Sequence, residues 1–279
     1  MPLYKTLLSI LFISACSNLN AQVKNNKIVK IPGITEPFQD AEISASVNGK
    51  IETIHYREGQ FVEKDTVVIQ LEDELEQLKV NGLKIMHDDK SELESATAKM
   101  ETAKINMEST QKLFQNTKAV SKQELDEIIL QYKVALADKN GQENKELREE
   151  IELQKAEYEL EQRAVKAPFP GVVADVKLEE GEACTANENL FRLVDISKFH
   201  FTCNLENDLA ISLKKDQAVD LEIVSGLELI EKKGIVEFIA PTIDPASGLR
   251  KVKILVDNPD FKITPGATGT LNIQVATVR

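Results

Sequence analysis

The 279-residue chain contains no tryptophan and only three cysteines and three histidines, and aromatic residues make up 5% of it. So few aromatics argue against a ligand pocket lined with aromatic side chains. The cysteines and histidines are scattered along the sequence, which excludes a zinc module built from clustered Cys and His ligands. No run of eighteen or more apolar residues occurs, so we expect no helix that spans a membrane.

The chain also has fewer positively charged than negatively charged residues. Lysine and arginine number 34 against 46 aspartates and glutamates, which gives a net charge of −12. This sign argues against a nucleic-acid binder, because phosphate recognition needs a basic face. Hydrophobic residues, at 42%, are sufficient for packed cores, and the length predicts about two domains. No nucleophile–base pair, phosphate loop or paired-acid motif is found, so we expect no enzyme, cofactor site or metal site.

The amino terminus has the layout of a secretory signal peptide. Lys5 precedes an apolar run that ends at Ala15, and small and polar residues follow. Two processing sites remain open: one removes residues 1–21, and the other removes residues 1–15 and leaves a lipid on Cys16. In either case we expect export, with membrane contact only through a lipid anchor.

An internal repeat at an offset of 122 residues marks the middle of the chain. The copies, residues 41–71 and 165–196, agree without a gap in glycine, acidic and apolar positions. The matched positions include Ala45 with Ala167, Ile51 with Val173, Glu58-Gly59 with Glu180-Gly181, Val62 with Cys184, and Leu71 with Leu193. Each copy has the pattern of short alternating strands and is too small to bury its apolar face alone. Two copies together would form one small β-sandwich.

Residues 72–164, between the copies, have the composition of long helices. None of the nine prolines and only two of the twelve glycines lie here. Apolar or small residues recur at steps of three and four, which predicts an α-helical coiled-coil hairpin with an irregularity near Asp89. The predicted seam is Leu75, Leu78, Gly82, Ile85, Leu93, Ala96, Met100, Ala103, Met107, Thr110 and Phe114, then Leu125, Ile128, Tyr132, Leu136, Leu147, Ile151 and Tyr158. Ser121 and Glu124 form a capping box that predicts the start of the second helix.

Alternation with period two returns in residues 197–275. Short strands separated by turn residues, with one small helix, predict a small antiparallel β-barrel. Residues 22–40 lack a partner of their own, and we expect them to join this barrel. The predicted fold class is therefore α+β, an elongated multidomain chain with a split sandwich, an inserted hairpin and a barrel. Cys184 and Cys203 could either pair or remain free.

Several segments together resemble the periplasmic adaptors of tripartite efflux pumps, also called membrane fusion proteins or the HlyD family. Residues 49–59 and 167–173 are similar to their biotinyl-lipoyl half-motifs, residues 120–126 to their hairpin tip, and residues 239–244 to their β-barrel. The resemblance implies a subunit that links an inner-membrane transporter to an outer-membrane channel for the export of small molecules. It also implies a periplasmic location, inner-membrane anchoring if Cys16 is lipidated, and self-association into a ring.

The resemblance implies that the hairpin tip docks the channel. The candidate docking residues are Leu113, Phe114, Val120, Ser121 and Leu125. Of these, we expect Val120 and Leu125 to be solvated in a monomer. The tip favours a proton-driven transporter of the resistance-nodulation-division (RND) type, although the arginine typical of that type is missing. An adaptor of an ATP-driven exporter stays open. The chain stops soon after Val275, so it resembles a short adaptor without a membrane-proximal domain.

A function from another class also stays open, that of a lipoyl- or biotinyl-type carrier domain of an acyl-transfer enzyme. Carriers of this kind attach their cofactor to a lysine at the turn between the two half-motifs. In this chain the predicted hairpin is inserted at that place, and no Met-Lys-Met or Asp-Lys-Ala tip is present.

Overall fold

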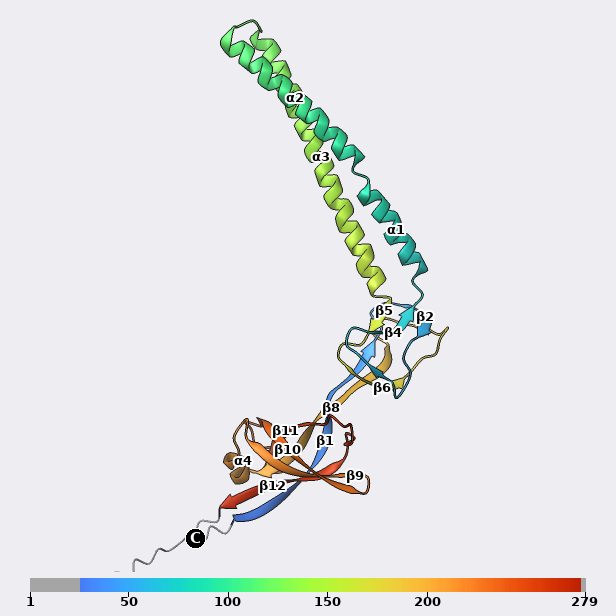
Figure 1. The fold of residues 1–279 in the computed structure, drawn as a ribbon, viewed down its shortest axis with the longest axis vertical. Coiled ribbons are helices and arrows are strands. Elements are labelled where there is room, and N and C mark those ends of the chain that lie inside the picture. Colours follow the sequence, from blue (N-terminus) through green and yellow to red (C-terminus); the bar gives the residue numbers. More distant parts are fainter. Residues whose placement is uncertain (1–25, 277–279) are drawn as a thin grey trace, which may run out of the picture. The chain divides into compact units, whose positions relative to one another are not determined.

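The computed structural model describes residues 26–276, so the predicted leader and Cys16 lie outside the described residues. The chain divides into two compact units. One contains residues 37–198 with residues 259–261, and the other contains most of the remaining residues. Two long strands, β1 (Asn26–Ser44) and β8 (Asn189–Glu206), contribute to both units (Figure 1).

The carboxy-terminal unit is a closed barrel of six strands, which confirms the predicted barrel. The strand order is β1-β12-β9-β10-β11-β8, and β8 pairs back with β1. The other elements are α4 (Asn207–Ser212), β9 (Ala218–Ser225), β10 (Glu228–Ile239), β11 (Leu249–Asp257) and β12 (Thr268–Ala276). Alternate residues point inward, and Phe199, Phe201 and Leu221 are among the fully buried side chains of its core. Closure leaves the sheet without an unpaired edge along the barrel.

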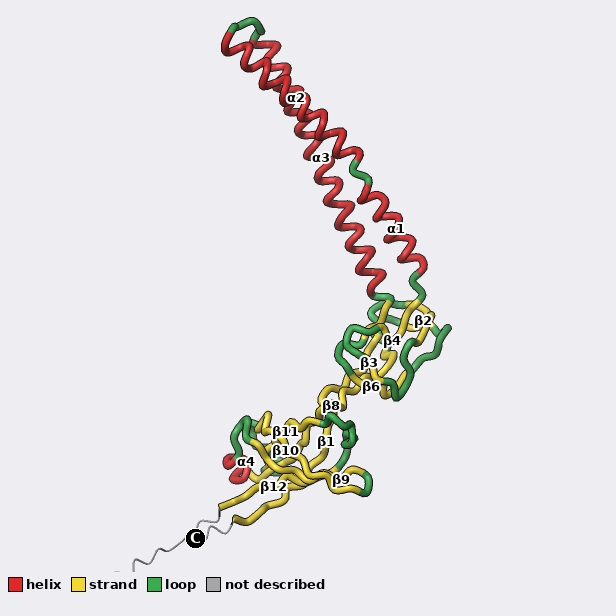
Figure 2. Tube along the Cα trace, viewed as in Figure 1, coloured by secondary structure: helices red, strands yellow, loops and turns green. Residues whose placement is uncertain are grey.

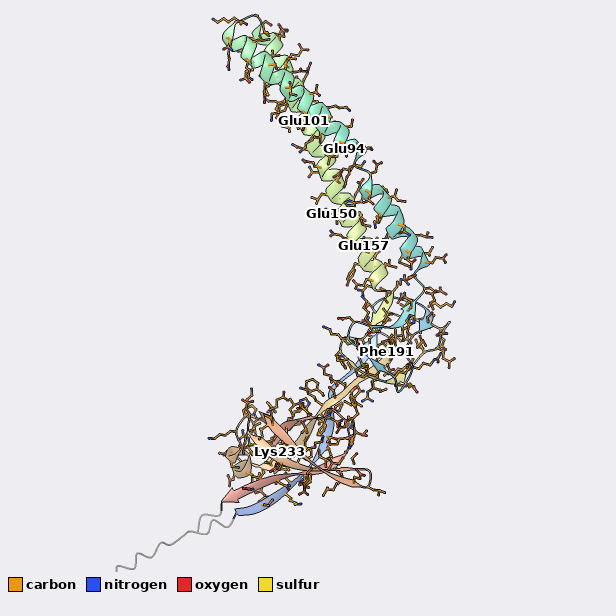
Figure 3. The ribbon with its side chains drawn as sticks, in the orientation of Figure 1. Glu94, Glu101, Glu150, Glu157, Phe191 and Lys233 are labelled. Carbon is orange, nitrogen blue, oxygen red and sulfur yellow. The ribbon has the colours of Figure 1, made fainter. Side chains whose placement is uncertain are left out.

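The second unit contains a β-sandwich that is built from both copies of the repeat. A four-stranded sheet, β5-β4-β2-β7, shares one core with β3, β6 and the first part of β8. The bounds are β2 (Gly49–Ile54), β3 (Phe61–Val62), β4 (Val67–Leu71), β5 (Ala164–Lys166), β6 (Gly171–Val176) and β7 (Ala183–Cys184). Equivalent residues of the two copies meet in this core, for example Ile51 and Val173, and Phe191 is fully buried in it (Figure 3). The predicted split sandwich is confirmed.

Between β4 and β5 the chain forms a helical hairpin (Figures 1 and 2). The first arm consists of α1 (Glu74–Asp88) and α2 (Ser91–Asn116), and both pack against the second arm, α3 (Lys122–Glu161). With 40 residues, α3 is about 60 Å long. The structure supports the helical hairpin, but the predicted coiled coil is not confirmed, because one regular seam does not run along its whole length. No helix within residues 26–276 is both long and apolar enough to cross a membrane.

Cys184 and Cys203 are free thiols, and each lies in the core of its own unit. Burial raises the pKa of the Cys203 thiol to about 12. Burial is also the main cause that raises the pKa of Cys184. A raised pKa keeps both thiols protonated, and only the thiolate is reactive. Both side chains therefore act as small apolar core residues.

Candidate functional site

The root of the hairpin is attached to the sandwich by hydrogen bonds from Arg163, which follows α3. Its Nη2 donates to Glu76 Oε1 at 2.5 Å, and its Nη1 donates to the Asn48 carbonyl at 3.1 Å. The side chains of Arg163 and Glu76 are only 21% and 20% exposed, so this pair is better shielded from solvent than a surface ion pair. A more exposed pair, Lys50 with Glu72 at 2.7 Å, adds to the attachment. These bonds connect α1 and the end of α3 to the same sandwich.

The distal half of the hairpin, which we define as α2 with residues 122–142 of α3, uses the predicted seam. The covered residues include Leu93, Ala96, Met100, Ala103, Met107, Thr110 and Phe114 on α2, and Leu125, Ile128, Tyr132 and Leu136 on α3. Ala96 and Leu125 are buried, and the others are half-buried. Here the spacing of apolar residues identified the residues that hold the two arms together.

The root half, which we define as α1 with residues 143–161 of α3, differs from the prediction. On α1 the predicted seam residues form what we call the α1 stripe, Leu75, Leu78, Gly82 and Ile85. Leu75, Leu78 and Ile85 are 78%, 63% and 74% exposed, so they do not face α3. Val80 and Leu83 are the apolar residues of α1 that are partly covered. The helix therefore has two apolar faces, and the other arm covers the less hydrophobic one.

On α3, too, the face that the other arm covers is not the predicted one. The predicted seam residues Leu147, Ile151 and Tyr158, which we call the α3 stripe, are 55%, 56% and 62% exposed. Leu153 and Ala156 are buried instead. The root half thus carries an uncovered apolar stripe on each arm, which is unusual for a surface helix.

The tip of the hairpin is a short turn that ends at Ser121. Ser121 is the N-cap of α3, and its Oγ accepts a hydrogen bond from the Glu124 N–H at 3.2 Å. Lys118 reverses the chain with a φ of +50°. The predicted start of the second helix is therefore correct to the residue.

The apolar residues near the tip have different exposures. Leu113 is 50% exposed, and Phe114 and Val120 are half-buried. Leu125 is only 9% exposed, so the expectation that it is solvated is wrong. It lies one turn beyond the cap, where α3 already packs against α2. The exposed apolar surface at the tip therefore centres on Leu113.

The first arm is interrupted at Asp89 and Lys90, where the sequence showed an irregularity (Figure 2). Asp89 is extended, with φ −80° and ψ 92°, and its Oδ1 accepts a hydrogen bond from the Ser91 N–H at 3.1 Å. Hydrogen bonds from Ser91 hold the pKa of Asp89 below its usual value of 3.8. On the side that faces α3, the Lys90 ammonium lies 3.3 Å from the Glu146 carboxylate.

The two copies of the repeat are joined by a reciprocal pair of hydrogen bonds. Glu58 Oε1 accepts from the Val176 N–H at 3.3 Å, and Glu180 Oε1 accepts from the Ile54 N–H at 2.9 Å. The two glutamates are 122 residues apart, and so are the two residues that donate, so each copy places the same carboxylate on the same amide of the other. In the sequence these glutamates are recognisable only as part of the repeat, and their Glu-Gly context in both copies is the signal for them.

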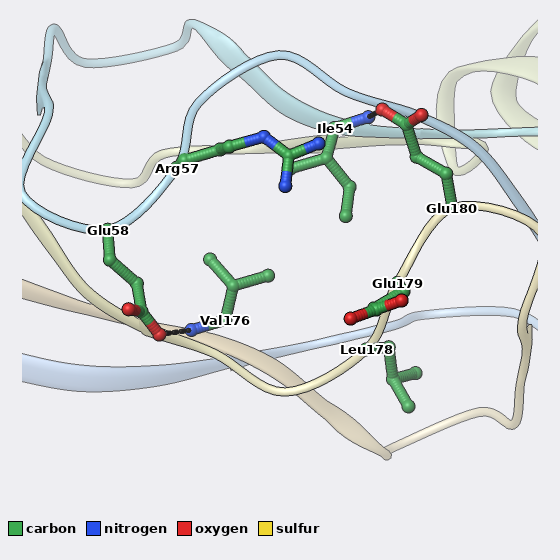
Figure 4. A pocket seen from close by; sticks show the side chains of 7 residues that line it. All are labelled: Ile54, Arg57, Glu58, Val176, Leu178, Glu179 and Glu180. Carbon is green, nitrogen blue, oxygen red and sulfur yellow. Dashed lines mark hydrogen bonds between the residues drawn. The ribbon is translucent and has the colours of Figure 1, made fainter.

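Next to these bonds lies an open cavity of about 640 Å³ between the copies (Figure 4). Ile54, Val176 and Leu178 contribute its apolar lining. Figure 4 shows Arg57 pointing toward the cavity from one copy, and Glu179 lines it from the other; these two residues are also equivalent in the repeat. The charged side chains that line the cavity are all exposed, so we assign no ligand to it.

Residues 39–195 match the family model described as the CzcB-like barrel-sandwich hybrid domain. The match covers the sandwich with its inserted hairpin and more than half of the chain. The chain belongs to this family. Its barrel-sandwich hybrid domain is the split sandwich described above, and the resemblance to membrane fusion proteins is confirmed.

Known proteins extend the similarity beyond the barrel-sandwich hybrid domain. The chain is 25% identical to the nodulation protein NolF of Rhizobium meliloti, over 85% of this chain and 61% of NolF. It is 24% identical to the macrolide export protein MacA of Escherichia coli O157:H7, over 88% of this chain and 68% of MacA. The crystal structure of MacA from Actinobacillus actinomycetemcomitans has a TM-score of 0.72 at 21% identity, over 90% of this chain and 79% of that one. The similarity to this crystal structure shows that the chain has the same fold. The chain spans less than two thirds of the length of NolF.

Proposed function

We propose that this chain is a periplasmic adaptor that links an inner-membrane transporter to an outer-membrane channel for the export of small molecules. The observation that carries the proposal is the capped helical hairpin inserted into a split barrel-sandwich hybrid domain, in a family match whose relatives include a macrolide export protein. The role is that of a linker without catalysis or cofactor. The carrier alternative is not favoured, because the helices occupy the connection where a carrier would present its lysine.

The channel would be contacted by the hairpin tip. Leu113 exposes half of its surface there, next to the half-buried Phe114 and Val120. Burial of an exposed leucine in a partner's groove lowers the free energy of the complex, because apolar surface is removed from water. Ser121 supports this surface through its cap on α3, and Leu125 supports it from the seam rather than by direct contact.

Self-association into a ring would use the two stripes of the root half. The α1 stripe and the α3 stripe are both exposed and apolar, and they lie on different arms of the hairpin. If the α1 stripe of one copy packs on the α3 stripe of the next, the contact is heterologous, and such contacts form a ring when the rotation from copy to copy closes. This use explains why apolar residues with the spacing of a seam are not covered within the chain.

The type of transporter and the membrane anchor are finer points of the same proposal. We favour an RND transporter on the resemblance of the tip alone, and an ATP-driven exporter would contact the same surfaces. We also propose that the leader directs the chain to the periplasm, with Cys16 carrying a lipid in the inner membrane. Loss of detergent-phase partitioning in Cys16→Ala would support the lipid, and unchanged partitioning would contradict it.

The adaptor role is tested by complementation of a deletion strain against a panel of small-molecule inhibitors. We expect the wild type to restore resistance and Leu113→Asp to fail, because a carboxylate at the tip opposes burial in a channel groove. Ile105→Asp is the matched control and should restore resistance. Ile105 is 63% exposed on the same helix and lies about two turns from Leu113. Circular dichroism should show both variants folded.

Two outcomes contradict this proposal at different levels. If Leu113→Asp restores resistance as well as the wild type does, the tip is not the docking surface. If deletion of the gene changes neither resistance nor the intracellular accumulation of any compound in the panel, the adaptor role itself is wrong.

A further inference from the structure

The break between α1 and α2 is required by the residues that face α3 on either side of it. Before the break, the Nδ1 atom of His87 is buried, and after the break Ala96 is 3% exposed. These residues are nine positions apart, which is about two and a half turns of a continuous α-helix. In such a helix Ala96 would point away from the side on which His87 lies. The interruption at Asp89 and Lys90 therefore allows both halves of the arm to face α3.

Near the break, the residues that are covered between the two arms are polar. Closer to the root and closer to the tip, the covered residues are apolar. Between Leu136 and Leu153, the covered residues of α3 are Lys139, Gln142, Glu146 and Glu149. Between Leu83 and Leu93, the covered residues of the first arm are His87 and Lys90. Apolar contacts between facing residues supply most of the stability of paired helices. This stretch, the polar segment of the hairpin (residues 87–92 and 139–149), lacks them.

The polar segment is also incompletely packed and incompletely hydrogen-bonded. A cavity of about 250 Å³ opens between the arms, and Met86, Leu93, Gln142 and Glu146 are among its lining residues. Within the described part of the chain, His87 Nδ1 and Glu146 Oε1 are buried without a hydrogen-bond partner. Buried polar atoms without partners lower the stability of the folded arrangement around them. The arms are held here mainly by exposed ion pairs such as Lys145 with Glu92.

The second arm has its own weak point close to this level. Gly141 lies in the middle of α3, its neighbour Asn140 also has a low helix propensity, and the Asn144 amide bonds back to the Asn140 carbonyl. A Cβ at Gly141 would meet no atom within 4 Å, so packing does not require a glycine there. Both arms are therefore weakened at neighbouring heights.

We propose that the polar segment is a hinge, at which the distal half of the hairpin bends relative to the root half. Its elements are a broken first arm, a glycine in the second arm, a seam without apolar contacts and a cavity into which side chains can move. In the proposed adaptor, the hinge lets the tip approach a channel from more than one direction. That use rests on the proposed function, but the hinge itself does not.

Hydrogen–deuterium exchange of the full chain tests the hinge on α3, where no helix end complicates the result. We expect amides of residues 139–149 to exchange about tenfold faster than amides of residues 125–136 and 152–158 of the same helix. The double variant His87→Leu/Glu146→Leu replaces the unpartnered polar atoms with an apolar contact. It should slow exchange in residues 139–149 by about fivefold or more, although one substitution lies on the other arm.

Glu150→Leu is the matched control, because Glu150 is exposed and adjacent to the polar segment on α3. It should leave the exchange of residues 139–149 unchanged. If the double variant does not fold, Gly141→Ala replaces it and should slow the same amides. Uniform protection along α3, or equal exchange in the wild type and the folded variant, would overturn the hinge. The resistance assay plays no part here, so failure of the adaptor role would leave this result intact.

Discussion

At the scale of single residues, the repeat preserves the positions where the backbone is most constrained. Gly59 and Gly181 have φ values of +81° and +91°, and another equivalent pair, Asp65 and Asn187, has φ values of +63° and +67°. Glycine adopts this region freely, and Asp and Asn are among the few other residues that enter it readily. Sequence comparison finds the glycine pair. The Asp and Asn pair differs in identity, so the offset aligns the two positions, but only the backbone shows that both adopt a positive φ.

The reciprocal glutamates give the first prediction at this scale. Glu180→Ala should lower the free energy of unfolding by about 1 kcal/mol, because the Ile54 N–H loses its acceptor. Glu58→Ala should cost less, since its bond to the Val176 N–H is longer, at 3.3 Å. Urea unfolding measures both, with Glu179→Ala as a control whose side chain also lines the cavity. A loss in the control equal to that of Glu180→Ala would show that the bond is not the cause.

The ion pair of Asp40 with Arg192 gives a prediction on pH. Arg192 Nε donates to Asp40 Oδ1 at 2.8 Å, and this hydrogen bonding holds the pKa of Asp40 below its usual value of 3.8. A carboxyl whose pKa is lowered by folding stabilises the protein above its unfolded pKa, and this contribution disappears as the pH falls through the folded pKa. Wild type should thus unfold at a higher urea concentration than Asp40→Asn at pH 7, with the difference shrinking below about pH 4. A difference that stays constant down to pH 2.5 would contradict this cause.

At the scale of elements, the sequence predicted the order of sandwich, hairpin and barrel, because the hydrophobic period changes from two in the sandwich to the helical spacing in the hairpin and returns to two in the barrel. It also placed the start of α3, since the cap is a local signal between Ser121 and Glu124. The root half of the hairpin could not be predicted in the same way. Leu75 and Leu78 have the right spacing for a seam, but spacing cannot tell whether the covering partner is the other arm or another molecule. The tip has the same limit, because Leu125 is covered only once α3 is placed against α2.

Two glycines in different elements should respond in opposite ways to alanine. A Cβ at Gly82 would meet no atom within 4 Å, so Gly82→Ala should stabilise α1 by about 0.5–1 kcal/mol. A Cβ at Gly171 would lie 2.7 Å from the Val194 carbonyl oxygen of the neighbouring strand. Gly171→Ala should therefore destabilise the sandwich by at least about 1 kcal/mol. Thermal unfolding of the two variants checks both signs, and a stabilised Gly171→Ala would contradict the close approach of β6 to β8.

At the scale of the whole molecule, charge restricts where copies of the hairpin can meet. Glu94 and Glu101 are exposed on α2 seven residues apart, and Glu150 and Glu157 are exposed on α3 with the same spacing (Figure 3). Residues at this spacing lie on one face of a helix. With a net charge of −12, two copies repel each other unless apolar contacts offset the repulsion. The α1 stripe and the α3 stripe are the surfaces on the root half that can provide such contacts.

The direction of this packing can be tested with one charge on each stripe. Leu78→Glu disables the α1 stripe, and Ile151→Glu disables the α3 stripe, in residues that are 63% and 56% exposed and so should not affect folding. If the contact is heterologous, each variant alone lacks one half of every interface and should stay monomeric. Glu150→Gln, an exposed change beside Ile151, should assemble like the wild type. Mass photometry or sedimentation velocity reports the species formed.

A mixture of the two variants distinguishes heterologous from isologous packing. The intact α3 stripe of Leu78→Glu can pair with the intact α1 stripe of Ile151→Glu, but neither partner has a second usable stripe. The mixture should therefore form dimers and nothing larger, whereas the wild type continues to larger assemblies. Packing of α1 on α1 would instead let Ile151→Glu dimerise alone, and packing of α3 on α3 would let Leu78→Glu do so. Assembly of Leu78→Glu or Ile151→Glu alone beyond a dimer would show that the stripes do not hold copies together.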